Sequence, residues 1–206
     1  MNTAPKSVAA LGAALVLALA LAGCGADDTA ATSSGASASS SASSSATAQH
    51  NEADVTFAQD MIVHHASAIA MAELAPDRAA SREVKALAEK VKAAQGPEIE
   101  TMTSWLKAWG QEVPEAGDHA TMGDGGASEM PGMMTAEQMN QLGDAQGSAF
   151  DRMFLQMMIK HHEGAVQMAQ TEQARGQNPE AIALAETIQD SQTAEIQHMN
   201  QLLRTM

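Results

Sequence analysis

Residues 61–68, MIVHHASA, decide the fold, because the chain repeats their pattern at residues 158–165 as MIKHHEGA. Each copy places a methionine three positions before an adjacent pair of histidines. On an α-helix of about 3.6 residues per turn, positions i, i+3, i+4 and i+7 lie on one face. The methionine and both histidines of each copy therefore form one helical stripe, and the two copies predict two similar helices.

The repeat extends far beyond these two stretches. The same offset relates Phe57 to Phe154 and Leu87-Ala88-Glu89 to Leu184-Ala185-Glu186. A single helical hairpin cannot bury its apolar stripe alone, whereas two paired hairpins can. We therefore predict an all-α four-helix bundle made of two repeated hairpins, residues 54–109 and 146–206, with a long crossover at 110–145.

Capping residues and helix breakers define the predicted helix ends. Helices are expected over residues 54–75, 81–109, 146–175 and 178–203. Ser81 and Asn178 are suitable N-caps, Gly110 suits the end of the second helix, and Thr135 with Gln138 predicts a capping box within the crossover. Pro97, preceded by Gly96, predicts a kink or break in the second helix.

The N-terminal segment has the features of a targeting signal. Lys6 precedes an apolar run over residues 8–22, which is short for a membrane span. The run ends in Leu21-Ala22-Gly23-Cys24, which resembles a bacterial lipobox. We interpret residues 1–23 as a lipoprotein signal peptide, Cys24 as the lipidated residue and 24–49 as a Ser/Ala-rich tether, which places the domain 50–206 outside the cytoplasm on the cell membrane. An ordinary secretory signal or an uncleaved anchor is the alternative.

The amino-acid composition excludes several kinds of reactive and metal-binding site. Cys24 is the only cysteine, so a lipidated chain has no disulfide, no cysteine nucleophile and no cysteine-based zinc site. The chain instead has 15 Met and 7 His against 3 Phe, 2 Trp and no Tyr. Its formal net charge of -14 argues against a nucleic-acid partner.

The methionine-rich stripes suggest a metal site. Imidazole nitrogen and thioether sulfur suit a soft or borderline metal such as copper. The predicted ligands of the two stripes are His64, His65, Met61, Met71, His161, His162, Met158 and Met168, with Glu98, Met102, Glu195 and Met199 on the facing helices and His198 as an additional donor. In the alternative interpretation the methionines fill the core, and the two glutamates only hydrogen-bond the histidines and fix their tautomers.

The crossover supplies a second group of candidate ligands. They are His119, Met122, Met130, Met133, Met134, Asp118 and Asp124. Methionines clustered on a glycine-rich segment resemble the motifs that hold Cu(I) or Ag(I) outside the cytoplasm. The alternative is a loop that folds over the bundle and buries its methionines.

These motifs resemble the domain-of-unknown-function 305 family of mostly bacterial secreted proteins. The resemblance rests on the two His-His stripes, on residues 95–99 with Met102 and Trp105, and on their counterparts in the second half. It implies a ferritin-like helical fold and a periplasmic or cell-surface location, with some relatives associated with copper binding and resistance. The chain departs from the usual pattern at Val63 and Lys160, where proline often precedes the histidines.

We therefore expect an extracytoplasmic copper-binding lipoprotein rather than an enzyme. It would bind Cu(I), with Ag(I) as a mimic, for buffering, sequestration or transfer with a donor or acceptor protein. The alternatives are a metal-free module that binds a partner and, less favoured, a di-iron ferroxidase. The di-iron site needs two Glu-x-x-His motifs, and only Glu195 with His198 provides one, because Thr101 occupies the equivalent position in the first half.

Overall fold

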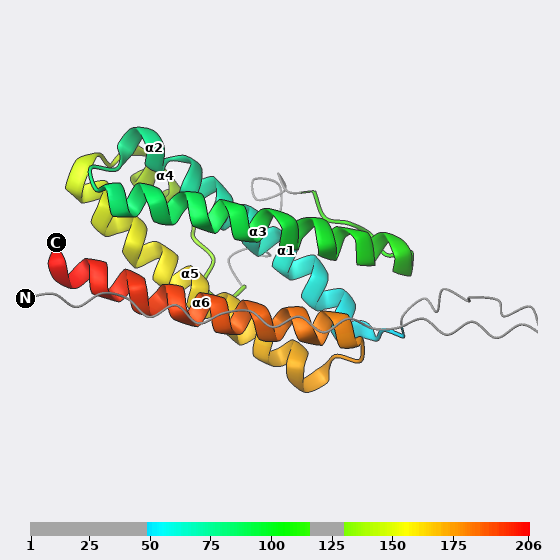
Figure 1. The fold of residues 1–206 in the computed structure, drawn as a ribbon. Helices are drawn as coiled ribbons and strands as arrows, with labels where there is room; N and C mark the ends of the chain where they lie inside the picture. Colours follow the sequence, from blue (N-terminus) through cyan, green and yellow to red (C-terminus); the bar gives the residue numbers. More distant parts are fainter. Residues whose placement is uncertain (1–48, 116–129) are drawn as a thin grey trace, which may run out of the picture. The chain divides into compact units, whose positions relative to one another are not determined.

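The computed structural model describes residues 49–115 and 130–206, and these form an all-α bundle, as predicted (Figure 1). The predicted signal segment, Cys24 and all but the last residue of the tether lie outside the described residues. The same holds for the crossover candidates Asp118, His119, Met122 and Asp124. Among the described residues, no helix is both long enough and apolar enough to cross a membrane.

The first hairpin consists of α1 (Glu52–Glu73) and α3 (Arg82–Trp109), joined by the single turn α2 (Ala75–Arg78). Ser81 caps α3, and Gly110 ends it in the left-handed conformation with φ 70°, as predicted. Helix α1 ends two residues earlier than expected, because Pro76 lies in the first turn of α2, where proline is tolerated.

The break predicted at Pro97 is absent, since α3 runs through this residue without interruption. Proline has no N–H to donate to the carbonyl group of Ala93. Both Pro97 and Ala93 are exposed, so water can satisfy that carbonyl oxygen. The helix therefore keeps the first half of the repeat in register with the second.

The second hairpin consists of α5 (Gly147–Arg175) and α6 (Pro179–Thr205). Asn178 caps α6 by accepting from the backbone N–H groups of Glu180 and Ala181. In the crossover, α4 (Ala136–Asp144) begins with the predicted capping box of Thr135 and Gln138. The predicted caps of the second half are confirmed.

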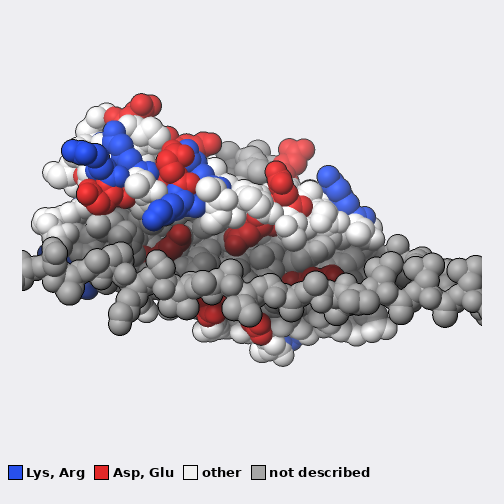
Figure 2. All heavy atoms as spheres, viewed as in Figure 1, with Lys and Arg blue, Asp and Glu red and all other residues white. Residues whose placement is uncertain are grey.

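The two hairpins meet mainly through α1 and α5 (Figure 1). Phe57 of α1 packs in one apolar cluster with Ala169 near the end of α5, and Phe154 near the start of α5 packs in another with Ala72 of α1. The two helices therefore cross in opposite directions. Figure 2 shows lysine and arginine side chains mixed with acidic ones over α2 and α3.

A buried carboxylate holds the start of α1 against the turn between α5 and α6. Asp54 accepts hydrogen bonds from the backbone N–H groups of Asn51 at 2.6 Å and Asn178 at 2.8 Å, and from that of Gln177. Glu172 lies beside it and is only 1% exposed. These contacts fasten one end of the interface between α1 and α5, where the start of α1 meets the end of α5.

Candidate metal centre

Two histidines, one from each half of the repeat, meet where α1 crosses α5. The ring centroids of His64 and His161 are 3.7 Å apart, and the ring planes are inclined by 41°. Their neighbours His65 and His162 lie close enough for His162 to affect the pKa of His65. All four side chains are completely buried. The sequence repeat thus becomes a cluster of four imidazoles at the centre of the bundle.

A carboxylate orients the outer histidine of each half. The Nε2 atom of His65 lies 2.7 Å from Oε2 of Glu98 on α3, and the Nε2 atom of His162 lies 2.6 Å from Oε2 of Glu195 on α6. The partners are 33 residues apart in both pairs. The glutamates therefore make the hydrogen bonds expected of groups that fix the histidine tautomer.

The protonation of His65 follows from its surroundings. Burial lowers the pKa of His65 and outweighs the hydrogen bond and the charge of Glu98, which raise it. The ring is therefore neutral near pH 7, and its single proton resides on Nε2, where Glu98 accepts it. Its Nδ1 atom keeps a free lone pair and has no hydrogen-bond partner among the described residues. A buried lone pair of this kind is available to a metal ion.

Four methionines lie one helical turn from the inner histidines or from the glutamates. Met61 and Met158 precede the inner histidines by one turn, and Met102 and Met199 follow the two glutamates by one turn. All four methionine side chains are completely buried. The buried amides of Gln95 and Gln192 lie one turn before the glutamates, and their Oε1 atoms have no hydrogen-bond partner within the described ranges.

These two amides were not among the predicted ligands. The repeat itself pointed to them, because Gln95 and Gln192 occupy equivalent positions on the helix faces that carry Glu98 and Glu195. Their amide oxygens are neutral donors near a site that the sequence had assigned to imidazole nitrogen, thioether sulfur and two carboxylates.

The remaining predicted ligands are Met71, Met168 and His198. Met71 and Met168 are seven residues beyond His64 and His161, which is about 10 Å along each helix axis. Met71 is buried in an apolar cluster, Met168 lines a surface cavity, and His198 is exposed on α6. The structure therefore brings together the imidazoles and the two glutamates. The four methionines are buried on the same helices, and Met71 shares an apolar cluster with Met158 and Met199.

The donor set favours one class of metal. In the part of the chain that the structure describes, no three His, Cys, Asp or Glu side chains are grouped as a metal site. The buried methionines and the buried amides of Gln95 and Gln192 could supply thioether sulfur and amide oxygen beside the imidazoles. Thioether and imidazole ligands select soft ions, whereas calcium and magnesium need carboxylate-rich oxygen sites.

The end of the crossover lies over the histidines. We call residues 130–134 the strap. The carbonyl oxygen of Pro131 accepts a hydrogen bond from Nε2 of His64 at 3.1 Å. Met133 and Met134 are each only 9% exposed, so this part of the crossover packs onto the bundle. For these two methionines the structure matches the alternative in which the loop buries its side chains.

The chain belongs to the family described as Domain of unknown function (DUF305), whose model matches residues 54–203. Among solved structures, a protein of Streptomyces coelicolor described as a secreted DUF305 protein is 35% identical, with a TM-score of 0.66. That match covers 74% of this chain and 93% of the other. The predicted family and all-α fold are confirmed.

CopM is a second structural relative. In its Cu(II)-bound form it is 36% identical, with a TM-score of 0.63, and the match covers 74% of this chain and 96% of CopM. CopM has also been solved in Cu(I)-bound and Ag-bound forms. The comparison with curated proteins gave no match.

Proposed function

We propose that this chain is an extracytoplasmic protein that binds Cu(I) at the crossing of α1 and α5. It would hold the ion for buffering, sequestration or transfer in copper homeostasis. One observation carries the proposal: four completely buried imidazoles, two from each half, meet one turn away from buried thioethers. Burying four polar rings in an apolar core costs free energy unless their nitrogen atoms form hydrogen bonds or bind an ion.

The chemistry of the cluster suits Cu(I). Imidazole and thioether donors are neutral; thioether sulfur is among the soft ligands that select Cu(I), and imidazole also suits copper. Glu98 and Glu195 strengthen their histidines as donors and place negative charge near the buried cation. The same charge would compensate the desolvation of a monovalent ion.

The relatives support both the ligand and the location. CopM, with Cu(I), Cu(II) and Ag in its solved forms, supports copper as the ion and Ag(I) as its mimic. The secreted relative from Streptomyces coelicolor supports an extracytoplasmic site. Together with the lipobox-like sequence ending in Cys24, it leads us to propose a lipid-anchored protein that exchanges copper with a donor or acceptor protein.

We further propose binding without catalysis. A di-iron oxidase of this architecture requires a Glu-x-x-His motif from each of two helices. The only such motif here pairs Glu195 with His198, which is exposed, and Glu195 already contacts His162.

The test is a competition titration of the purified chain with Cu(I) under anaerobic conditions. We expect replacement of both inner histidines, His64→Ala with His161→Ala, to weaken Cu(I) binding by at least about tenfold, because it removes ligands from a buried site. The matched control is His198→Ala, which removes an exposed imidazole and should leave the affinity unchanged. Equal affinities in folded wild-type and double-variant protein would refute the proposed site.

A further inference from the structure

The strap contacts α5 through two glycines. A Cβ atom on Gly164 would overlap the carbonyl group of Pro131, and one on Gly132 would overlap the carbonyl oxygen of Lys160. Gly132 also has φ 79°, which other residues rarely adopt. The strap can therefore lie directly on α5, beside the histidines, only because both positions lack a side chain.

This contact lies beside the second His-His pair of the repeat. Gly164 follows the second His-His pair at the position where Ser67 follows the first. Glycine inside a helix lowers stability relative to alanine, and a Cβ at Gly164 would meet backbone atoms rather than a movable side chain. The close approach of the strap thus accounts for glycine in the middle of α5.

Among the described residues, the strap is a non-helical segment that contacts the histidine cluster. His64 donates its Nε2 proton to Pro131, while the other contacts of the cluster described above come from α3, α5 and α6. Separating those helices would break the bundle, whereas the strap has one turn-type backbone hydrogen bond of its own, from Met133 to Met130. Segments of this kind open at a lower free-energy cost than packed helices.

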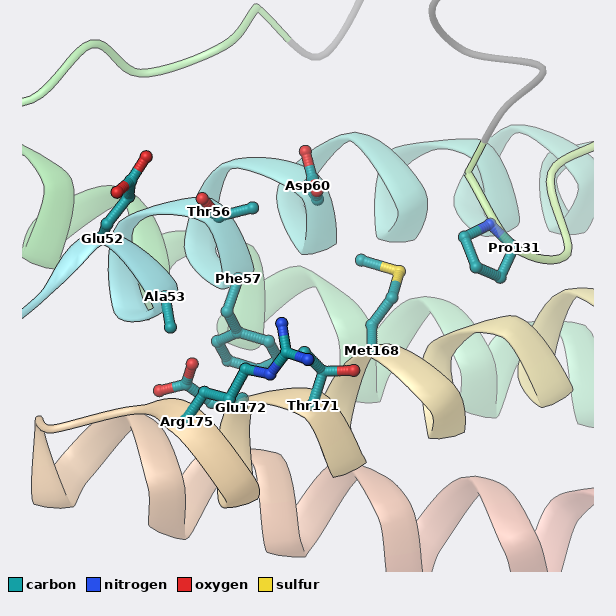
Figure 3. A pocket seen from close by; sticks show the side chains of 10 residues that line it. All are labelled: Glu52, Ala53, Thr56, Phe57, Asp60, Pro131, Met168, Thr171, Glu172 and Arg175. Atoms are coloured by element: carbon teal, nitrogen blue, oxygen red, sulfur yellow. The ribbon is translucent and has the colours of Figure 1, made fainter.

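A cavity of about 480 Å³ reaches the strap from the solvent side between α1 and α5. Its lining includes Pro131, Met168 and Phe57 (Figure 3). Met168 extends from α5 toward α1, between the labelled positions of Asp60 and Pro131 (Figure 3). A soft sulfur atom and a carboxylate therefore line the space immediately outside the strap.

We propose that the strap is the gate through which a soft metal ion reaches the buried histidines from this cavity. This inference rests on the proposed function. In the closed state Pro131 covers His64 and occupies its Nε2 proton. When the strap moves off Gly164, the cavity becomes continuous with the crossing of α1 and α5, and Met168 is a transient contact on the path rather than a final ligand.

The first measurement needs no metal. Diethyl pyrocarbonate modifies accessible neutral histidines, and peptide mapping of the full chain follows each histidine separately. His198 is exposed and serves as an internal reference. We expect Gly164→Ala to accelerate the modification of His64 and His161 about tenfold relative to His198, equivalent to about 1.4 kcal/mol less stability for the closed strap. Gly143→Ala is the control, because a Cβ there meets nothing within 4 Å.

A second pair of variants tests the same idea without touching α5. Met134 anchors the strap in the apolar core, whereas Met139 packs against the same core from α4. Met134→Ala should accelerate the modification of His64, and Met139→Ala should not. Circular dichroism must show the helical content of wild type for all four variants.

The second measurement is the rate of Ag(I) uptake by the full chain. Faster uptake in Gly164→Ala and Met134→Ala, together with faster modification, supports the gate. Unchanged modification of His64 in the folded Gly164→Ala and Met134→Ala variants would overturn the gate, even if Ag(I) still binds. If Ag(I) does not bind while modification accelerates, the strap controls access and it is the proposed metal function that fails.

Discussion

The carboxyl group of Glu172 lies beside that of Asp54 in the buried contact between α1 and the end of α5, and the two groups differ in protonation. Burial, together with the interaction with Asp54, raises the pKa of Glu172 to about 8. Burial also raises the pKa of Asp54, but hydrogen bonds from the backbone of Asn51, Asn178 and Gln177 outweigh it, so the net pKa is lowered. At neutral pH, Glu172 is neutral and Asp54 is charged.

This arrangement predicts that alkaline pH destabilises the domain. The folded chain binds the Glu172 proton more tightly than the unfolded chain, so the free energy of unfolding falls as pH rises from 4.5 to about 8. Glu172→Gln keeps a neutral side chain at every pH. At pH 9 it should raise the unfolding temperature by about 3 °C or more, since 1 kcal/mol corresponds to roughly 2–4 °C in a domain of this size.

At pH 5 wild type and Glu172→Gln should unfold at similar temperatures, because folded wild type keeps Glu172 neutral at that pH, as the glutamine of the variant is. The control is Glu163→Gln, an exposed position on α5, which should show no difference at either pH. Thermal unfolding followed by circular dichroism at both pH values gives the comparison. An equal pH dependence in wild type and Glu172→Gln would contradict the assignment.

The carboxylates that orient the histidines should contribute to metal affinity. Glu98→Gln replaces the charged acceptor of His65 with a neutral amide and so makes the imidazole a weaker donor. We expect Cu(I) affinity to fall by roughly tenfold, as seen when such supporting groups are changed. Glu100→Gln is a matched control, because Glu100 is exposed two residues further along the same helix. Similar losses in both variants would indicate a general charge effect instead.

The methionines should divide into two groups. Met61→Leu removes a sulfur atom one turn from His64 at nearly constant volume, a change that usually lowers stability by less than about 1.5 kcal/mol. Cu(I) affinity should decrease in this variant, whereas Met168→Leu should leave the equilibrium affinity unchanged because Met168 lies in the outer cavity. Anaerobic competition titrations of both variants measure the difference. A larger loss for Met168→Leu would place the site in the cavity.

Acid should weaken metal binding only at a pH below the usual pKa of histidine. Because burial lowers the pKa of His65 below 6.5, the ring stays neutral between pH 7.5 and 6.5 and its Nδ1 lone pair remains available. Ag(I) affinity should hold across that interval and decline at lower pH, as protons compete for the nitrogen. A competition titration from pH 7.5 to 5 tests this, and an affinity that stays constant to pH 5 would argue against histidine ligands.

Much of the fold could be predicted from local patterns. The repeated His-His stripes gave the two hairpins, and Ser81, Thr135 and Asn178 marked helix starts correctly because capping depends on residues within one turn. Of the kink or break expected at Pro97, the break is absent, since exposure to solvent lets a helix tolerate a missing backbone donor. The facing of Glu98 toward His65 also followed from the repeat, because both hairpins must close in the same way.

The contacts between distant segments could not be predicted in this way. Periodicity does not reveal where an irregular crossover returns, so the contact of Pro131 with His64 was missed. The sequence signal for this contact is Gly164. It lies in the middle of a helix, where glycine is unfavourable, and the equivalent position of the first half carries Ser67. Likewise, the pairing of Asp54 with Glu172 depends on the crossing of α1 and α5. This crossing buries two acidic side chains next to each other, which the sequence pattern of neither helix predicts.

Joining two equivalent hairpins in one polypeptide removes their equivalence. A covalent connection between the halves must run along one flank, and here residues 130–134 cover Gly164, at the position where the first half carries Ser67. Two identical, unconnected hairpins would present the same face twice. The fusion therefore distinguishes the two flanks of an otherwise twofold interior, and under the gate proposed above an ion would enter from the flank that the strap covers.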